Sequence, residues 1–148
     1  AKRKTSKILK NNKRVKVDFQ CKDISKVNLK KSNLIISVLL FPFLNLDQRK
    51  SLLKKIYKSL NSGGAFICVE KIRAKNSYFE DILNQMYFDF KLSKNLSEEE
   101  ILNKAKSLRS SMYLFDEKKS KSLLESAGFK NYEIFFKCFN FIGYIAIR

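Results

Sequence analysis

The sequence has 148 residues, 45% of them hydrophobic, so it can bury one core of ordinary size and forms a single domain at most. It contains no histidine, which excludes a histidine-based catalytic triad, a histidine proton shuttle and the common zinc sites, and we expect no bound metal. No apolar run approaches the roughly 20 residues that cross a bilayer, and we expect a soluble, cytoplasmic protein without membrane contact.

The formal net charge of +17 is the strongest compositional signal. Clustered lysine and arginine attract nucleic-acid phosphates through counterion release. Only six of the 31 basic residues are arginine, however, and arginine is the better phosphate ligand, whereas scattered lysines also serve as solubilising residues. Charge alone therefore leaves direct nucleic-acid binding as the less favoured interpretation.

The three cysteines do not indicate a disulfide framework. Cys21, Cys68 and Cys138 stand far apart in apolar, strand-like contexts, and any pairing leaves one of them over. We interpret all three as reduced thiols in the core of a cytosolic protein.

The N-terminal part of the chain holds two predicted strands. Residues 1–14 are basic and are expected to form an exposed helix or a frayed arm, and the alternation over Val15–Phe19 predicts a short strand whose carboxyl end precedes Asp23. The nearly unbroken apolar run Leu34–Phe41 predicts a strand buried on both faces of a parallel sheet, ended by Pro42.

A helical crossover leads to the next strand. Asp47 is the predicted cap of a helix that ends at Gly63-Gly64, and Ala65–Val69 is a second buried strand. The apolar positions at helical spacing are Leu52, Leu53, Ile56 and Leu60. Strand, helix and strand form one βαβ unit of a doubly wound α/β sheet.

Ligands of such sheets bind beyond the carboxyl ends of the strands. The sequence therefore predicts a site near residues 41–46 and 70–73. Glu70 lies at this edge, and we expect it to be structural, paired with Lys71, Arg73 or a lysine of the following segment.

Residues 74–113 are predicted to form two consecutive helices with no strand between them. Helical spacing of apolar residues defines the first, and Ser97 with Glu100 forms a capping box that opens the second. We interpret 74–113 as a helical lid over the carboxyl edge of the sheet. Core packing is the favoured role of its aromatic residues, and stacking on a base is the alternative; they are Tyr78, Phe79, Tyr87, Phe88 and Phe90.

The last part of the chain predicts one helix and a strand pair. Asp116 caps the helix, which ends at Gly128. Tyr132–Lys137 and Phe139–Ile147 are joined tightly enough to lie antiparallel.

This order of elements resembles the C-terminal half of a class I S-adenosylmethionine-dependent methyltransferase. Several stretches are more specifically similar to the carboxy-S-adenosylmethionine synthase family, which serves tRNA wobble-uridine modification. They are LDQRKSLLKKIYKSLNSGGAFICVEK (46–71), FDFK (88–91), SEEEI (97–101) and AGFKNYEIFFKCFNF (127–141). The likeness covers nearly all of residues 1–148 as one partial methyltransferase-like domain.

The resemblance implies a Rossmann-like sheet that lacks its N-terminal strands. Such enzymes bind S-adenosylmethionine with a glycine-rich turn after the first strand and an acidic residue after the second, and neither feature is present here. We expect an incomplete chain whose missing strands leave sheet edges that invite association.

The resemblance also assigns site residues. Asp23 and Ile24 match the position that contacts the adenine of the cofactor; the alternative is that Asp23 caps a turn and Ile24 belongs to the core. An asparagine of the family falls at Val38, and the arginine that holds the carboxylate of its cofactor falls at Ala105. Arg109 lies one helical turn later and is the candidate catalytic residue, with an exposed helical arginine as the alternative.

The implied reaction transfers the carboxyl group lost by prephenate to the sulfonium methyl carbon of S-adenosylmethionine, which gives carboxy-S-adenosylmethionine. The implied partners are prephenate, a second copy of the chain that meets the lid, and tRNA through weak or indirect contact. Two alternatives stay open: an ordinary S-adenosylmethionine-dependent methyltransferase, which Val38 and Ala105 favour, and a non-catalytic basic module that binds tRNA or a partner enzyme.

Overall fold

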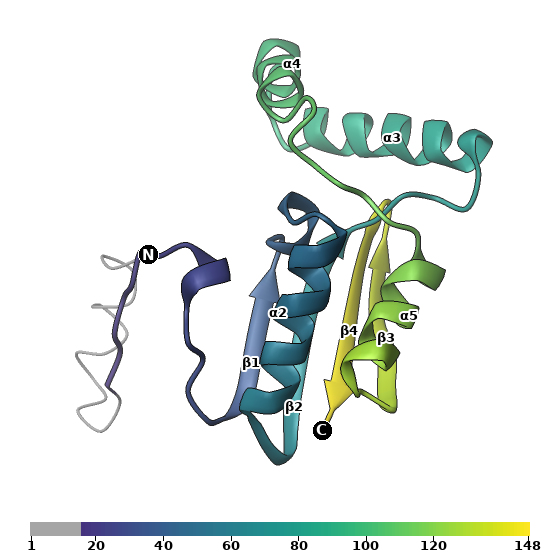
Figure 1. Cartoon of the computed structure of the whole chain (residues 1–148). Coiled ribbons are helices and arrows are strands. Elements are labelled where there is room, and N and C mark those ends of the chain that lie inside the picture. Colours follow the sequence, from purple (N-terminus) through teal and green to yellow (C-terminus); the bar gives the residue numbers. More distant parts are fainter. Residues whose placement is uncertain (1–15) are drawn as a thin grey trace.

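The computed structural model describes residues 16–148, which form an α/β fold with one mixed four-stranded sheet. The strands are β1 (Ser32–Val38), β2 (Leu60–Lys71), β3 (Asn131–Cys138) and β4 (Phe141–Ile147), in the order β1-β2-β4-β3. β1 and β2 are parallel, and β4 is antiparallel to both β2 and β3 (Figure 1). The predicted crossover and the predicted C-terminal antiparallel pair are confirmed.

The crossover helix is α2 (Leu46–Ser59), and both of its predicted ends are wrong. Asn45 caps it in place of Asp47, because the Asn45 side chain accepts from the Gln48 N–H at 3.0 Å and the Gln48 side chain accepts from the Asn45 N–H at 3.0 Å. The helix ends at Ser59 and the chain enters β2 directly, so Gly63, at φ +74°, forms a local distortion inside the strand and does not stop the helix.

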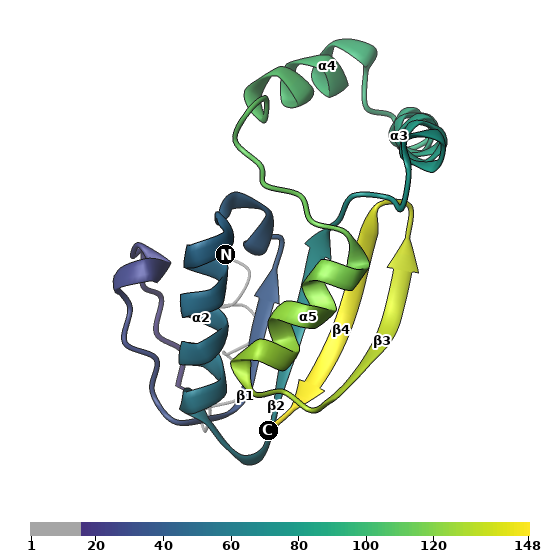
Figure 2. The same cartoon turned by 45° about the vertical axis from the view of Figure 1, so that its right-hand side comes forward.

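One face of the sheet is fully covered. α2 and α5 (Glu117–Ala127) lie side by side on it (Figure 2), and between helices and sheet is the main hydrophobic core. Asp116 caps the start of α5 and Gly128 caps its end, as predicted, with Gly128 in the left-handed conformation at φ +113°. The most deeply buried apolar side chains of this core are Phe41, Leu53, Ile56, Leu60, Phe66, Leu124, Phe129, Ile142 and Ala146.

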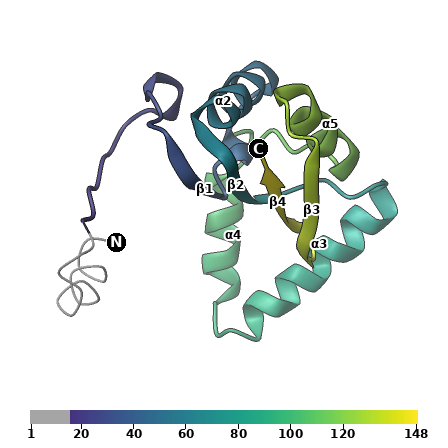
Figure 3. The ribbon, with the colours of Figure 1, turned by 90° about the horizontal axis from the view of Figure 1, so that it is seen from below.

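The opposite face of β1 is exposed, so the prediction that Leu34–Phe41 is buried on both faces is wrong. Leu34, Ile36 and Val38 alternate along this face with exposed fractions of 50%, 58% and 61%. No helix within residues 16–148 packs on it (Figure 3), and β1 is one of the two edge strands of the described sheet. The strand also ends early, at Val38, because Leu39 adopts φ +55° and residues 41–43 form a short 3-10 turn that contains Pro42.

The segment before β1 contains no strand among residues 16–31, so the strand predicted over Val15–Phe19 is wrong for the part that the structure describes. The only regular element there is the 3-10 turn η1 (Ile24–Lys26). The basic segment 1–14 and Val15 lie outside the described residues.

The segment 74–113 contains two consecutive helices, α3 (Ser77–Leu92) and α4 (Glu98–Ser107). The capping box of Ser97 and Glu100 opens α4 as predicted. Both helices lie beyond the carboxyl ends of β1 and β2 (Figure 1), and they reach out over the side of the sheet opposite α2 and α5 (Figure 3). α3 has no buried residue, so core packing is the wrong role for Tyr78, Phe79, Phe88 and Phe90.

The cysteines differ in environment. Cys68 is completely buried, whereas Cys21 and Cys138 are exposed, so the prediction of three core thiols holds only for Cys68.

Within residues 16–148 no group of three or more candidate side chains is arranged to hold a metal ion. None of the described helices is both long and apolar enough to cross a membrane.

Candidate functional site

Asp23 lies at the start of η1 and has an exposed carboxylate. Its Oδ1 accepts from the Ser25 N–H at 2.9 Å and from the Ser25 hydroxyl at 2.8 Å. These hydrogen bonds hold the pKa of Asp23 below its usual value, so the group is ionised at neutral pH. Both bonds use Oδ1, which leaves Oδ2 without a partner among the described residues.

Ile24 is half-buried and faces α2. It packs against the core and lines a cavity of about 260 Å³ whose other wall is Leu44 and the first three turns of α2. The polar lining residues on α2 are Asp47, Gln48, Ser51 and Lys55. The structure therefore places Ile24 at this cavity beside α2, whereas Asp23, the preceding residue, is not among the residues that line it.

Glu70 is buried at the carboxyl end of β2, and its partner is Arg49, not Lys71, Arg73 or a lysine of the lid. Arg49 Nη1 donates to Glu70 Oε2 at 2.8 Å, and both side chains are 1% exposed. The hydroxyl of Tyr144 donates to Glu70 Oε1 at 2.9 Å. Because both carboxylate oxygens are used within the fold, Glu70 has the structural role expected of it.

Arg49 also fixes the segment that returns from the lid. Its Nη2 donates to the Tyr113 carbonyl at 2.6 Å, and its guanidinium lies 4.5 Å from the ring centroid of Phe115. The Tyr113 N–H donates to the Pro42 carbonyl at 2.7 Å, and the Arg73 N–H donates to the Phe115 carbonyl at 2.9 Å. One buried guanidinium thus holds together helix α2, the end of β2 and the segment 113–115 that follows α4.

Sequence reasoning missed Arg49, although a signal exists. Arg49 precedes Leu52 and Leu53 by three and four residues, so it lies on the apolar stripe of α2. A charged residue on a buried stripe requires a buried partner.

The core around this ion pair raises the pKa of two neighbouring acids. Burial and the Glu70 charge raise the pKa of Cys68 to about 12, and burial raises the pKa of Tyr144 well above its usual value.

Arg109 lies outside the helix to which it was assigned. α4 ends at Ser107, and Arg109 follows in an exposed turn where its side chain makes no hydrogen bond or ion pair within residues 16–148. Ala105 is exposed on the last turn of α4, and Val38 is the exposed last residue of β1. Among the described residues, the structure brings Ile24 to α2 but brings Arg109 into contact with neither Asp23 nor Ile24.

The family model described as the ubiE/COQ5 methyltransferase family matches residues 2–146. The chain belongs to this family. Curated relatives of this ubiE/COQ5 chain are named carboxy-S-adenosyl-L-methionine synthase. The chain is 38% identical over 126 residues to the synthase from Staphylococcus epidermidis, and the match covers 85% of this chain and 55% of the relative. It is 33% identical over 134 residues to the synthase from Actinobacillus succinogenes, and that match covers 90% of this chain and 56% of the relative. The chain thus spans about half the length of the curated relatives it matches.

Solved structures show the same fold at low identity. The human N-acetylserotonin methyltransferase in complex with S-adenosylmethionine matches with TM-score 0.59 at 18% identity, covering 88% of this chain and 33% of that one. The S-adenosylmethionine-dependent methyltransferase SibL in its apo form matches with TM-score 0.61 at 11% identity, covering 97% and 39%. The fold of this ubiE/COQ5 chain is therefore that of class I methyltransferases, and the comparisons support S-adenosylmethionine as its cofactor.

Proposed function

We propose that this chain forms the C-terminal part of a carboxy-S-adenosylmethionine synthase. The observation that carries the proposal is the identity of 33% to 38% with relatives of that name over 85% to 90% of the chain. The whole enzyme transfers the carboxyl group lost by prephenate to the sulfonium methyl carbon of S-adenosylmethionine, and the product serves tRNA wobble-uridine modification.

In this proposal Asp23 and Ile24 hold the adenine of the cofactor. The free Oδ2 of Asp23 accepts from the exocyclic amine, because the carboxylate is ionised and its other oxygen is already occupied. Ile24 presents an apolar surface at the mouth of the cavity beside α2, which covers one face of the base. These are features of a cofactor half-site, since the chain carries no glycine-rich turn for the remaining part of the cofactor.

Arg109 is proposed to hold the carboxylate. Its guanidinium has no partner among the described residues, and Arg49 anchors the segment that follows it by the bond to the Tyr113 carbonyl. An arginine with all its donors available forms a bidentate pair with a carboxylate. The residue lies on the lid, so it reaches the cofactor by closure of 74–113 or from a second subunit.

The open side of β1 is proposed as the surface on which the remaining part of the enzyme completes the sheet. The exposed stripe of Leu34, Ile36 and Val38 is continuous with Ile67 of β2 and Ile145 of β4, which are paired across the same face. Within residues 16–148 the outer edge of β1 is also unpaired, and an exposed apolar stripe beside a free strand edge favours further chain that pairs with β1 and covers this face.

A homodimer in the cytoplasm is the proposed assembly. The lid helices and the turn between them carry exposed apolar side chains, which favours this segment as the contact between subunits. The exposed set comprises Phe79, Met86, Phe88, Phe90, Leu92, Leu96 and Leu102.

A complementation assay tests the proposed reaction. The chain is mixed with the part of the Staphylococcus epidermidis relative that the alignment does not cover, S-adenosylmethionine and prephenate are added, and carboxy-S-adenosylmethionine is measured by mass spectrometry. We expect product from the mixture. Arg109→Ala should lower the yield at least about tenfold, because it removes a charged hydrogen bond to the carboxylate, whereas Lys106→Ala on the same lid should not. A stable complex that makes no carboxylated product would overturn the proposal.

An ordinary S-adenosylmethionine-dependent methyltransferase is the second candidate. It is favoured by Ala105, which places no cation at the matching position, and by the description of the matched family. If this candidate is right, the mixture of the chain with the part of the relative should bind S-adenosylmethionine but form no product from prephenate.

A further inference from the structure

A second, larger cavity lies away from Asp23 and Ile24. It has a volume of about 670 Å³ and sits between the segment after β2, the first turns of α3 and α5, and the turn that joins β3 to β4. None of its lining residues lines the cavity beside Ile24. Its volume is within the range of about 300 to 1,000 Å³ typical of small-molecule sites.

The walls of this cavity are partly apolar. Ile72 comes from the segment after β2, Phe79 and Leu83 from α3, and Phe139 from the turn between β3 and β4. Ile72 is buried, whereas the Phe79 ring is half exposed. An apolar or aromatic group of a ligand can therefore bury its surface here against three separate elements.

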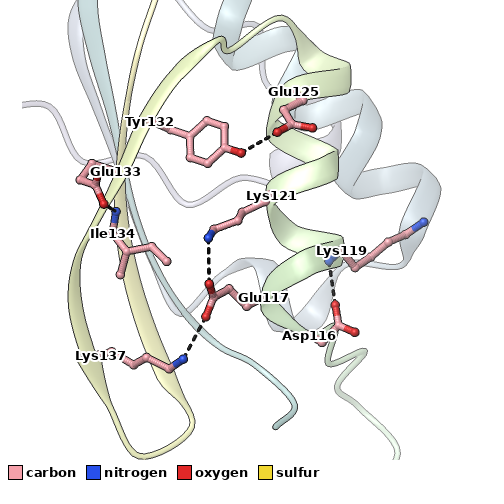
Figure 4. A network of polar contacts seen from close by, with 9 residues as sticks. All are labelled: Asp116, Glu117, Lys119, Lys121, Glu125, Tyr132, Glu133, Ile134 and Lys137. Atoms are coloured by element: carbon pink, nitrogen blue, oxygen red, sulfur yellow. Dashed lines mark hydrogen bonds and ion pairs between the residues drawn. The ribbon is translucent and has the colours of Figure 1, made fainter. Parts of the chain in front are cut away.

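The polar lining is dominated by cations. Five basic side chains and two acidic ones line the cavity. Glu117 engages two of the lysines: its carboxylate lies 2.8 Å from Lys121 Nζ and 2.9 Å from Lys137 Nζ (Figure 4). These hydrogen bonds hold the pKa of Glu117 below its usual value, so it stays ionised at neutral pH and fixes both lysines at the wall.

The remaining three cations have no anion of their own. Arg73, Lys75 and Lys118 form no ion pair within residues 16–148. The second acidic residue, Asp116, accepts from the Lys119 N–H at 2.7 Å as the cap of α5. The cavity therefore carries an excess of positive charge at the N-terminal end of an 11-residue helix, whose dipole adds to the same field.

We propose that this cavity binds a small organic oxyanion, in which a carboxylate or phosphate group is attached to an apolar or aromatic body. Arg73, Lys75 and Lys118 receive the anionic group, and Ile72 with the α3 side chains receives the body. The geometry favours a small molecule over an RNA strand, because the cations line a single hollow of about 670 Å³ together with apolar side chains. The proposal is independent of the carboxyl-transfer reaction.

Binding to the intact 148-residue chain tests the proposal. Phenyl phosphate serves as the probe, with benzyl alcohol as the uncharged probe and inorganic phosphate as the anion without a ring. Backbone amide shifts in a ¹⁵N-labelled sample report the position of binding. We expect phenyl phosphate to shift residues 72–75, 79–83 and 116–118 and to bind at least about fivefold more tightly than either control probe.

A matched pair of lysine variants on α5 separates a site from general surface charge. Lys118 lines the cavity, whereas Lys119 is exposed and its side chain points away from Glu117 and Lys121 (Figure 4). Lys118→Gln should weaken phenyl phosphate binding at least about threefold, whereas Lys119→Gln, which removes the same charge, should change it less than twofold. Adding Arg73→Gln to Lys118→Gln should bring the loss to about tenfold.

Two results would overturn the proposal. One is an equal loss of affinity in the Lys119→Gln variant, or shifts spread over all basic regions, which indicates diffuse charge attraction. The other is salt-steep binding of a single-stranded RNA oligonucleotide at the same residues with no phenyl phosphate binding, which assigns the surface to nucleic acid. Neither result bears on whether the complemented chain makes carboxy-S-adenosylmethionine.

Discussion

The two faces of the sheet differ although their strands have similar apolar sequences. On the face beneath α2 and α5, Phe66 and Ile142 are at most 1% exposed. On the opposite face, Leu34 and Ile36 are at least half exposed. The first face is a packed core. The second face is as apolar as a core, but nothing within residues 16–148 covers it, which is typical of a surface that another segment or chain covers.

Replacing Arg49 on the covered face should have the largest effect on the free energy of unfolding. Arg49→Met leaves the Glu70 carboxylate buried without its cation and should lower the free energy of unfolding by about 3 to 5 kcal/mol. Urea denaturation followed by circular dichroism measures this. The exposed neighbour Lys50→Met is the control and should change stability by less than about 0.5 kcal/mol.

The double variant Arg49→Met with Glu70→Gln sharpens the result. It removes both charges and keeps a hydrogen-bond acceptor for the Tyr144 hydroxyl, so it should be more stable than Arg49→Met alone. If Arg49→Met and Lys50→Met were equally stable, the buried ion pair would not organise this face.

The same substitution on the two faces gives the most direct comparison of their packing. Ile142→Ala removes a side chain that is 1% exposed and should cost about 2 to 5 kcal/mol, because it leaves a cavity. Ile36→Ala removes one that is 58% exposed and should cost less than about 1 kcal/mol in the isolated chain. Equal losses in urea denaturation would show that the open face is packed in solution.

The pH dependence of the free energy of unfolding tests the covered face with a smaller expected effect. Burial raises the folded-state pKa of Cys68 to about 12, whereas the thiol of the unfolded chain ionises near 9. The unfolded state therefore loses its proton first, and stability is retained below about pH 9 and falls as pH rises toward 12, by about 1.4 kcal/mol per pH unit. Urea midpoints at pH 8 and 10 measure the fall, which Cys68→Ala should reduce and the exposed Cys21→Ala should not. A fall unchanged by Cys68→Ala would contradict this.

The sequence predicts those features that depend on neighbouring residues. The capping box of Ser97 and Glu100, the start of α5 at Asp116 and its stop at Gly128 are local hydrogen-bond or backbone effects, and all are present. The predicted end of α2 is wrong because a glycine pair resembles a helix stop, whereas the chain passes from Ser59 directly into β2.

Features that depend on partners far apart in the sequence cannot be predicted from neighbouring residues. A strand pattern reports that side chains of Leu34–Val38 are apolar but not what covers them, because the covering layer lies elsewhere in the sequence. The Arg49 and Glu70 side chains are separated by 21 residues, and Tyr113 by 64 from Arg49, so only the fold brings them together. The roles of Asp23, Ile24 and Arg109 stay predictions.

Hydrogen exchange at β1 tests the central claim, that its open side is the surface on which the enzyme is completed. Amide exchange in residues 32–38 is measured by mass spectrometry for the chain alone and for the chain mixed with the part of the Staphylococcus epidermidis relative that lies outside the alignment. The account predicts slower exchange in β1 on addition of that part, because the free N–H groups of the edge strand become paired, and no such change for Ile36→Lys. Binding of the two parts with unchanged exchange in β1 would contradict it.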